Sequence, residues 1–152
     1  FSARLMQTVR DAQGLTYGIS AFIGGENNGN DGYWAVWSNF APQLVQTGHG
    51  ATIEQIEKWA TEGITKEELE AKKNTITGSY KVGLANTGGL ASQILSNAER
   101  GRSTTFLDGF PEIINGLTVD EINSVIKKYI NKDSLLFVAA GSLDENGKPL
   151  ED

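Results

Sequence analysis

The residues in this sequence that are best suited to binding or catalysis are Arg10 and Tyr17, which lie seven positions apart on either side of Gly14. Arg10 lies off the apolar stripe of a predicted helix, near its C-terminus, and Tyr17 lies near the start of a predicted strand. Because the chain reverses at Gly14, both side chains can point to one neighbourhood. A guanidinium and a phenol side by side are two strong hydrogen-bond donors, which suits a carbonyl oxygen that becomes an oxyanion.

A purely structural interpretation of the same two residues is also open. Arg10 can stabilise the negative end of its helix dipole, and Tyr17 can be an ordinary core residue of a β-hairpin. The residue types alone favour this second interpretation.

Other residues that bind metals in proteins form no comparable pattern. The 152 residues include no cysteine and one histidine, His49, so disulfides, cysteine nucleophiles and zinc sites built from Cys and His are excluded. Glycines flank His49 and no Glu follows at metalloprotease spacing, which is typical of a surface or capping histidine. A further group resembles a calcium loop in composition but lacks EF-hand spacing, and we predict a solvated hairpin loop there: Glu26, Asn27, Asn28, Asn30 and Asp31.

The overall composition excludes two further classes of partner. The formal charge is −6, from 13 basic and 19 acidic residues, whereas nucleic-acid binders usually carry a basic face. The longest uncharged apolar run, residues 135–140, is far shorter than a membrane span. No signal peptide is visible and Phe1 is not an initiator methionine, so we expect a processed chain or an excised piece of a longer protein.

Hydrophobic periodicity predicts the elements that position Arg10 and Tyr17. In the first predicted strand a period of two places Tyr17 on the same face as Ile19. In the second strand, Trp34 and Trp37 fall on opposite faces, so we predict one in the core and one exposed. The elements of this part are a helix over 2–13 capped by Ser2 and ended by Gly14, a strand over 15–23, a turn-rich loop over 24–32 and a strand over 33–40.

Helical spacing dominates the rest of the chain. The first predicted helix covers 42–62 and is ended by Gly63, and the second begins at the capping box Thr65 to Glu68. Three more helices are predicted over 90–98, 106–115 and 118–129, the last of which begins at a second capping box. Their predicted inward faces are Val45, Thr52, Ile56 and Trp59; Leu69, Ile76 and Tyr80; Leu90, Ile94, Leu95 and Ala98; and Ile122, Val125, Ile126 and Tyr129. A final strand is predicted over 135–140.

Hairpin strands followed by grouped helices predict a single α+β domain over residues 1–152, with helices on one face of a mainly antiparallel sheet. Three strands make a thin sheet for so many helices. We therefore expect one or more further strands upstream of Phe1.

Several segments together resemble the C-terminal domain of the pitrilysin and insulinase family of zinc peptidases. The resemblance covers nearly the whole chain in the right order. The matching segments are FSARLMQTVR (1–10) followed by GLTY (14–17), GITKEELEAKKN (63–74), GLA (89–91), TVDEI (118–122) with Tyr129, and the closing strand that ends at Gly141.

The resemblance implies a clamshell enzyme built from repeated α+β domains of the pitrilysin and mitochondrial-processing-peptidase type. In that family an inverted His-x-x-Glu-His motif in the first domain binds zinc. The motif is absent here, so the chain resembles the opposite, inactive domain, truncated at its N-terminus. This implies that the chain binds no metal, that a partner domain or subunit carries the zinc, and that the fragment alone is inactive.

The family resemblance also assigns roles to the two residues singled out above. The Arg and Tyr that match Arg10 and Tyr17 reach across the closed chamber, bind the peptide substrate and stabilise the tetrahedral intermediate. Zinc and a Glu of another domain activate the water. The resemblance reverses the preference for a structural interpretation of this pair.

Two alternative functions remain open beside the peptidase, and a cellular compartment can be predicted. Non-catalytic structural or assembly subunits of the family keep the fold but lose zinc ligands, and the presence of both Arg10 and Tyr17 favours the enzyme over them. A stand-alone peptide-binding module is disfavoured because half a clamshell offers one wall. We expect the bacterial periplasm or cell envelope, which the lack of cysteine fits, with the cytoplasm or mitochondrial matrix as alternatives.

Overall fold

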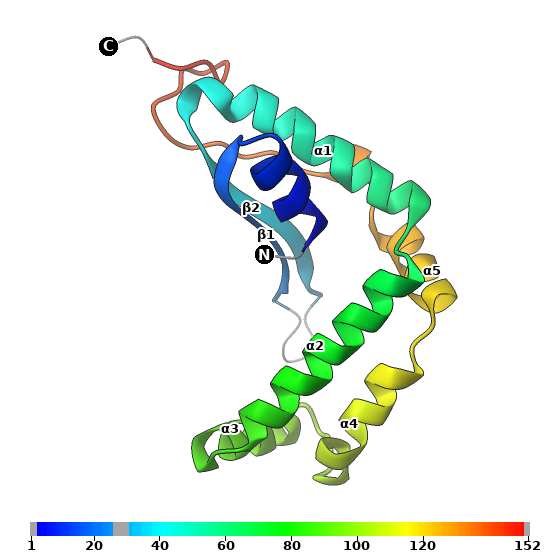
Figure 1. Cartoon of the computed structure of the whole chain (residues 1–152). Coiled ribbons are helices and arrows are strands. Elements are labelled where there is room, and N and C mark those ends of the chain that lie inside the picture. The colour runs from blue at the N-terminus through cyan, green and yellow to red at the C-terminus, as the bar shows by residue number, and fades with distance from the viewer. Residues whose placement is uncertain (1–2, 26–30, 151–152) are drawn as a thin grey trace.

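The computed structural model describes residues 3–25 and 31–150, and its α+β fold confirms the predicted class. In chain order the elements are the π-helix η1 (Met6–Ala12), β1 (Thr16–Gly24), β2 (Tyr33–Phe40), the 3-10 turn η2 (Pro42–Leu44), α1 (Val45–Glu62), α2 (Lys66–Leu84), α3 (Thr87–Glu99), α4 (Thr105–Gly116), α5 (Val119–Tyr129) and the 3-10 turn η3 (Lys132–Ser134). The hairpin of β1 and β2, the helix η1 and α1 form one end of the molecule, and α2, α3 and α4 form a helical arm (Figure 1).

The strands β1 and β2 pair in antiparallel fashion, and within the described residues they form a two-stranded sheet. Thr16 pairs with Phe40, but the next pair is Ile19 with Ser38. Two residues of β1, Tyr17 and Gly18, therefore lie opposite one residue of β2, Asn39, which is a β-bulge. From Ile19 onward the pairing is regular to the end of β1.

The core lies on one face of this hairpin and is built from three elements. Val9 of η1 and Ala51 of α1 pack with Ile19 of β1. Both helices thus cover the same face of the sheet. The partly buried residues around this cluster are Leu5, Met6, Leu15, Val36 and Phe40.

The predicted division of the two strand tryptophans is confirmed. Trp34 packs against Trp59 of α1, with ring centroids 5.8 Å apart. Trp37 is exposed on the other face of the hairpin. The helix α1 approaches β2 closely because Gly48 lacks a Cβ atom, which would overlap the Phe40 ring.

The junction between α1 and α2 is tied to the first helix by hydrogen bonds. Gly63 ends α1 with φ 73°, and Thr65 and Glu68 form the predicted capping box of α2. Arg4 donates to both carboxylate oxygens of Glu68, each at 2.6 Å, and to the Gly63 carbonyl oxygen at 2.8 Å. The side-chain amide of Asn123 accepts from the Ile64 N–H at 2.8 Å. Elements from both ends of the chain therefore meet at this junction.

Within the arm, Tyr80 joins α2 to α4. The Tyr80 and Phe110 rings lie 4.5 Å apart, and the Tyr80 hydroxyl donates to the Leu107 carbonyl oxygen at 3.1 Å. Burial raises the pKa of the Tyr80 phenol above its ordinary value.

The predicted inward face of α3 is wrong, although the helix itself is confirmed. Leu90, Ile94, Leu95 and Ala98 are all exposed. The reason is geometric: α3 packs against α2 and α4 near the end of the arm, and no further element of the described chain covers its apolar stripe. Ile76, Val125 and Tyr129 are likewise exposed, in contrast to the prediction.

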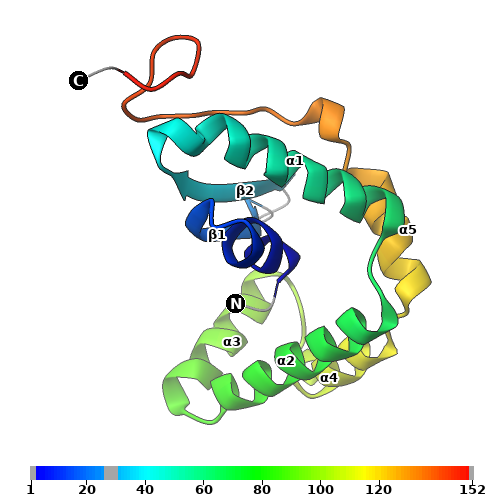
Figure 2. The same cartoon turned by 45° about the horizontal axis from the view of Figure 1, so that its top comes forward.

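The predicted strand over 135–140 is also wrong. The segment adopts no strand pairing and runs alongside α1 toward the C-terminus (Figure 2). Leu136 and Val138 are 89% and 76% exposed. A run of strongly β-forming residues becomes a strand only when a neighbouring strand satisfies its backbone, and no described strand pairs with this segment.

The helices of the described part of the chain were compared with the length and hydropathy of a membrane span. None of the helices there is both long enough and apolar enough to cross a bilayer.

Candidate functional site

Arg10 lies on a helix of unusual geometry. Residues Met6–Ala12 form a π-helix instead of the predicted α-helix, and the Gln13 N–H donates to the Thr8 carbonyl oxygen, five residues earlier, at 3.1 Å. The proposed cap Ser2 lies outside the described residues. Because a π-helix has more residues per turn, it rotates the following side chains relative to an α-helix. Short π-helical segments are rare and occur frequently at functional sites.

The end of this helix agrees with the prediction from the sequence. Gly14 adopts φ 63°, and its N–H donates to the Arg10 carbonyl oxygen at 2.8 Å. The Leu15 N–H then donates to the Val9 carbonyl oxygen at 3.1 Å. These bonds reverse the chain within three residues, so the last turn of the helix lies beside the start of β1.

Tyr17 lies within the β-bulge at the start of β1. The prediction that it shares a face with Ile19 is wrong, since the bulge interrupts the alternation between Thr16 and Ile19. Ile19 is buried in the core, whereas the Tyr17 side chain is 89% exposed. Bulges of this kind re-aim single side chains, commonly next to active sites.

The two side chains do meet, as their spacing predicts. The Arg10 guanidinium carbon lies 5.4 Å from the centre of the Tyr17 ring, within the range of a cation–π contact. The Arg10 side chain is 25% exposed and also pairs with Asp11, Nη1 to Oδ1, at 3.3 Å. The geometry thus presents a fixed positive charge and an exposed phenol at one place on the surface.

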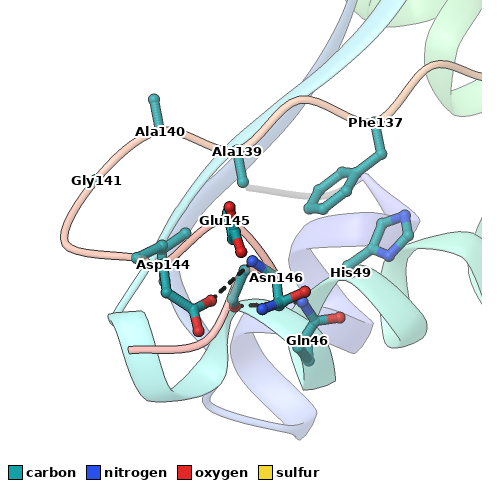
Figure 3. A pocket seen from close by; sticks show the side chains of 11 residues that line it. Gln46, His49, Phe137, Ala139, Ala140, Gly141, Asp144, Glu145 and Asn146 are labelled. Atoms are coloured by element: carbon teal, nitrogen blue, oxygen red, sulfur yellow. Dashed lines mark hydrogen bonds between the residues drawn. The ribbon is translucent and has the colours of Figure 1, made fainter. Parts of the chain in front are cut away.

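His49 lies on α1 and lines a surface pocket to which neither Arg10 nor Tyr17 contributes. Its ring stacks on Phe137 with centroids 3.9 Å apart, and both line a pocket of about 480 Å³ beside the loop over 144–147 (Figure 3). The loop closes on itself, because Asp144 accepts hydrogen bonds from the Asn146 and Lys148 N–H groups at 2.9 and 2.8 Å. His49 therefore acts as a packing residue, in line with the predicted surface histidine.

The described residues do not fit a zinc ion. In the part of the chain that the structure describes, no group of three His, Cys, Asp or Glu side chains could hold a metal ion. Zinc in proteins takes three or four such ligands. Of the loop that resembles a calcium site in composition, Glu26, Asn27, Asn28 and Asn30 lie outside the described residues.

Two features of the site, the π-helix and the β-bulge, were not predicted from the sequence. The π-helix has no distinct signature, because its apolar residues also fit helical spacing of four and three. The bulge did leave a signal in Gly18, since a glycine inside a strand commonly marks a bulge.

Comparison with protein families identifies the first half of the chain. Residues 1–76 match the model of the peptidase M16 inactive domain. This segment contains η1, the hairpin, α1 and the start of α2, and thus both Arg10 and Tyr17.

Curated relatives extend the likeness over nearly the whole chain. An uncharacterized zinc protease of Streptomyces coelicolor is 24% identical over 151 residues, which is 99% of this chain and 32% of that protein. An uncharacterized zinc protease of Bacillus subtilis is 23% identical over 93% of this chain and 34% of its own length. The chain therefore spans about a third of the curated relatives it matches.

Two solved structures share the fold. The peptidase M16 inactive domain from Pseudomonas fluorescens superimposes with a TM-score of 0.78 and 22% identity, over 88% of this chain and 31% of that one. The periplasmic protease PqqL from Escherichia coli gives a TM-score of 0.64 and 15% identity, over 83% and 14% of the two chains. Since the family model covers half of the sequence and the relatives nearly all of it, the chain belongs to the peptidase M16 family, whose inactive domain it matches.

Proposed function

We propose that this chain is the substrate-binding, metal-free part of a zinc-dependent peptidase that hydrolyses peptides or proteins. The match to the inactive domain and the likeness to zinc proteases support this assignment. The metal chemistry is assigned to another domain or subunit, because the described residues offer no zinc site. On this proposal the chain alone hydrolyses no peptide, and the protein works in the periplasm or cell envelope.

One observation carries the proposal for the site. The Arg10 guanidinium and the exposed Tyr17 phenol lie together, with 5.4 Å between the guanidinium carbon and the ring centre. Both groups donate hydrogen bonds at neutral pH, and neither needs to lose a proton to do so. Such a pair matches the lone pairs of peptide carbonyl oxygens.

The two residues have different roles in the proposed mechanism. Arg10 anchors a carbonyl of the bound peptide, an interaction made in the ground state and kept in the transition state. Tyr17 donates to the oxygen of the scissile carbonyl, a bond that strengthens as negative charge develops there. Only the second interaction grows in the transition state, so Tyr17 acts on kcat and Arg10 chiefly on KM.

A tyrosine substitution in the complete protein tests this proposal. Tyr17→Phe removes one hydroxyl group and keeps the ring under Arg10. We expect kcat for a peptide substrate to fall about a hundredfold, the usual loss when one oxyanion donor is removed. The measurement is steady-state hydrolysis of a fluorogenic peptide, together with the zinc content of each preparation.

Tyr129→Phe is the matched control. Tyr129 is also exposed and also lies beside a cation, Lys128, whose ammonium nitrogen is 4.9 Å from the ring centre. We expect this variant to keep the kcat of the unmodified protein. Full activity of Tyr17→Phe at normal zinc content contradicts the role proposed for Tyr17. Absence of peptide hydrolysis by the unmodified complete protein favours the non-catalytic, structural subunit instead.

A further inference from the structure

The β-bulge that carries Tyr17 is enclosed by two hydroxyl side chains. The Thr16 hydroxyl donates to the Asn39 carbonyl oxygen at 2.5 Å and accepts from the Gly18 N–H at 3.2 Å. The Ser38 hydroxyl lies 3.0 Å from both the Thr16 hydroxyl oxygen and the Gly18 carbonyl oxygen, and can donate to either. These bonds satisfy backbone groups that the bulge withdraws from the regular ladder.

The core explains why the bulge exists. Thr16 and Ile19 are both buried, at 8% and 4% exposure, yet they are three positions apart. In a regular strand such residues point to opposite faces, because side chains alternate with a period of two. If the extra residue were removed from the pairing, Ile19 would turn away from Val9 and Ala51.

The bulge also determines where Tyr17 points. Tyr17 and Gly18 lie between the two buried residues and together face the single residue Asn39 of β2. Their backbone groups cannot all pair with β2, so the local conformation depends on the hydroxyl groups of Thr16 and Ser38. A change of conformation here displaces the Tyr17 ring relative to Arg10.

We propose that Thr16 and Ser38 are positioning residues of the site, whose hydroxyl groups hold the β-bulge in the conformation that presents Tyr17 beside Arg10. Neither hydroxyl touches the substrate. The catalytic consequence rests on the proposed function, whereas the structural role of the two hydroxyls does not.

The principal test is Thr16→Val in the complete protein, because valine has the same shape as threonine and lacks the hydroxyl. We expect kcat to fall at least about tenfold with little change in KM, as expected when a catalytic group is misplaced by a fraction of an ångström. Thr16→Ser, which keeps the hydroxyl, restores most of the loss. Ser38→Ala, at a less buried position, gives a smaller loss in the same direction.

Thr52→Val is the matched control. Thr52 is also 8% exposed, and its hydroxyl donates to the Gly48 carbonyl oxygen at 2.7 Å within α1. This variant loses a buried hydroxyl of the same kind away from the bulge, and we expect its kcat to match that of the unmodified protein. Equal losses in Thr16→Val and Thr52→Val assign the effect to general destabilisation and overturn the proposal.

Two further measurements separate this inference from the proposed function. In a Tyr17→Phe background, Thr16→Val should lower kcat no further, and a full additional tenfold loss overturns the positioning role. Hydrogen exchange of the segment over 15–24 gives a readout independent of activity. We expect faster exchange in Thr16→Val and not in Thr16→Ser. Unchanged exchange in Thr16→Val overturns the inference, whatever the activity of Tyr17→Phe.

Discussion

At the residue scale, Arg10 and Tyr17 combine two kinds of interaction. The guanidinium lies against the face of the Tyr17 ring, a contact worth about 0.5–1 kcal/mol at exposed sites. It also pairs with Asp11, whose exposed carboxylate adds little stability. These contacts orient Arg10 more than they stabilise the fold, which is the expected behaviour of a binding residue.

Substitution of Arg10 should therefore change substrate binding more than folding. For Arg10→Met in the complete protein we expect KM to rise about tenfold, because a charge-assisted hydrogen bond to a carbonyl is lost in both ground and transition states. Arg10→Lys should give an intermediate value, since an ammonium keeps the charge and loses the planar fork of donors. Steady-state kinetics with a fluorogenic peptide measures both parameters.

Lys128→Met is the control for this prediction. It removes a cation that lies over the Tyr129 ring in a comparable pair on α5. An unchanged KM is expected there. If Arg10→Met leaves KM and kcat unaltered while Lys128→Met does the same, Arg10 has no role in binding the peptide.

At the scale of elements, the ion pair between Arg4 and Glu68 connects the helix of the site to the arm. The hydrogen bond from Arg4 lowers the pKa of Glu68, and the Glu68 carboxylate also accepts from the Thr65 N–H at 2.8 Å. The pKa of Glu68 is thus lower in the folded than in the unfolded state. Its stabilising effect is present at neutral pH and is lost as pH falls through the folded-state pKa.

We predict that Glu68→Gln destabilises the fold at pH 7 and destabilises it less at acidic pH. The Glu68 side chain is 36% exposed, so solvent screening reduces the expected loss in the free energy of unfolding to about 1 kcal/mol. Urea unfolding at pH 7 and at about pH 3 measures the difference. A loss that is equal at both pH values shows that the charge of Glu68 contributes nothing, and Glu54→Gln, at an exposed position of α1, serves as the control.

The same elements show what the sequence could and could not predict. Both capping boxes and the turn at Gly63 are local, because a few neighbouring residues determine each of them, and all are confirmed. The exposed stripe on α3 and the unpaired segment over 135–140 depend on what lies beside them, which the periodicity of a single segment does not contain. Interactions between neighbouring residues leave a recognisable pattern in the sequence, whereas contacts between distant segments do not.

The site follows the same division. The proximity of Arg10 and Tyr17 follows from one turn at Gly14 and could be predicted. The exposure of Tyr17 could not, because it results from a bulge that the core imposes through Ile19. The roles of both residues in catalysis stay predictions.

At the scale of the whole molecule, the chain is about a third of the length of its curated relatives, and its described part contains no group of three side chains that could hold a metal ion. We predict that the chain alone binds no zinc with micromolar or better affinity and hydrolyses no fluorogenic peptide. Equilibrium dialysis followed by elemental analysis measures the first, and a peptide assay with added zinc the second. Stoichiometric zinc binding by this chain refutes the assignment of the metal to another domain or subunit.

The affinity of a tetrahedral analogue tests the central claim most directly. A phosphinic peptide resembles the tetrahedral intermediate, whereas an uncleaved peptide of the same sequence resembles the ground state. In the complete protein, we predict that Tyr17→Phe weakens binding of the phosphinic peptide by the same factor, about a hundredfold, by which it lowers kcat/KM, and leaves the affinity for the uncleaved peptide nearly unchanged. Equal affinity of the phosphinic peptide for Tyr17→Phe and the unmodified protein contradicts the account.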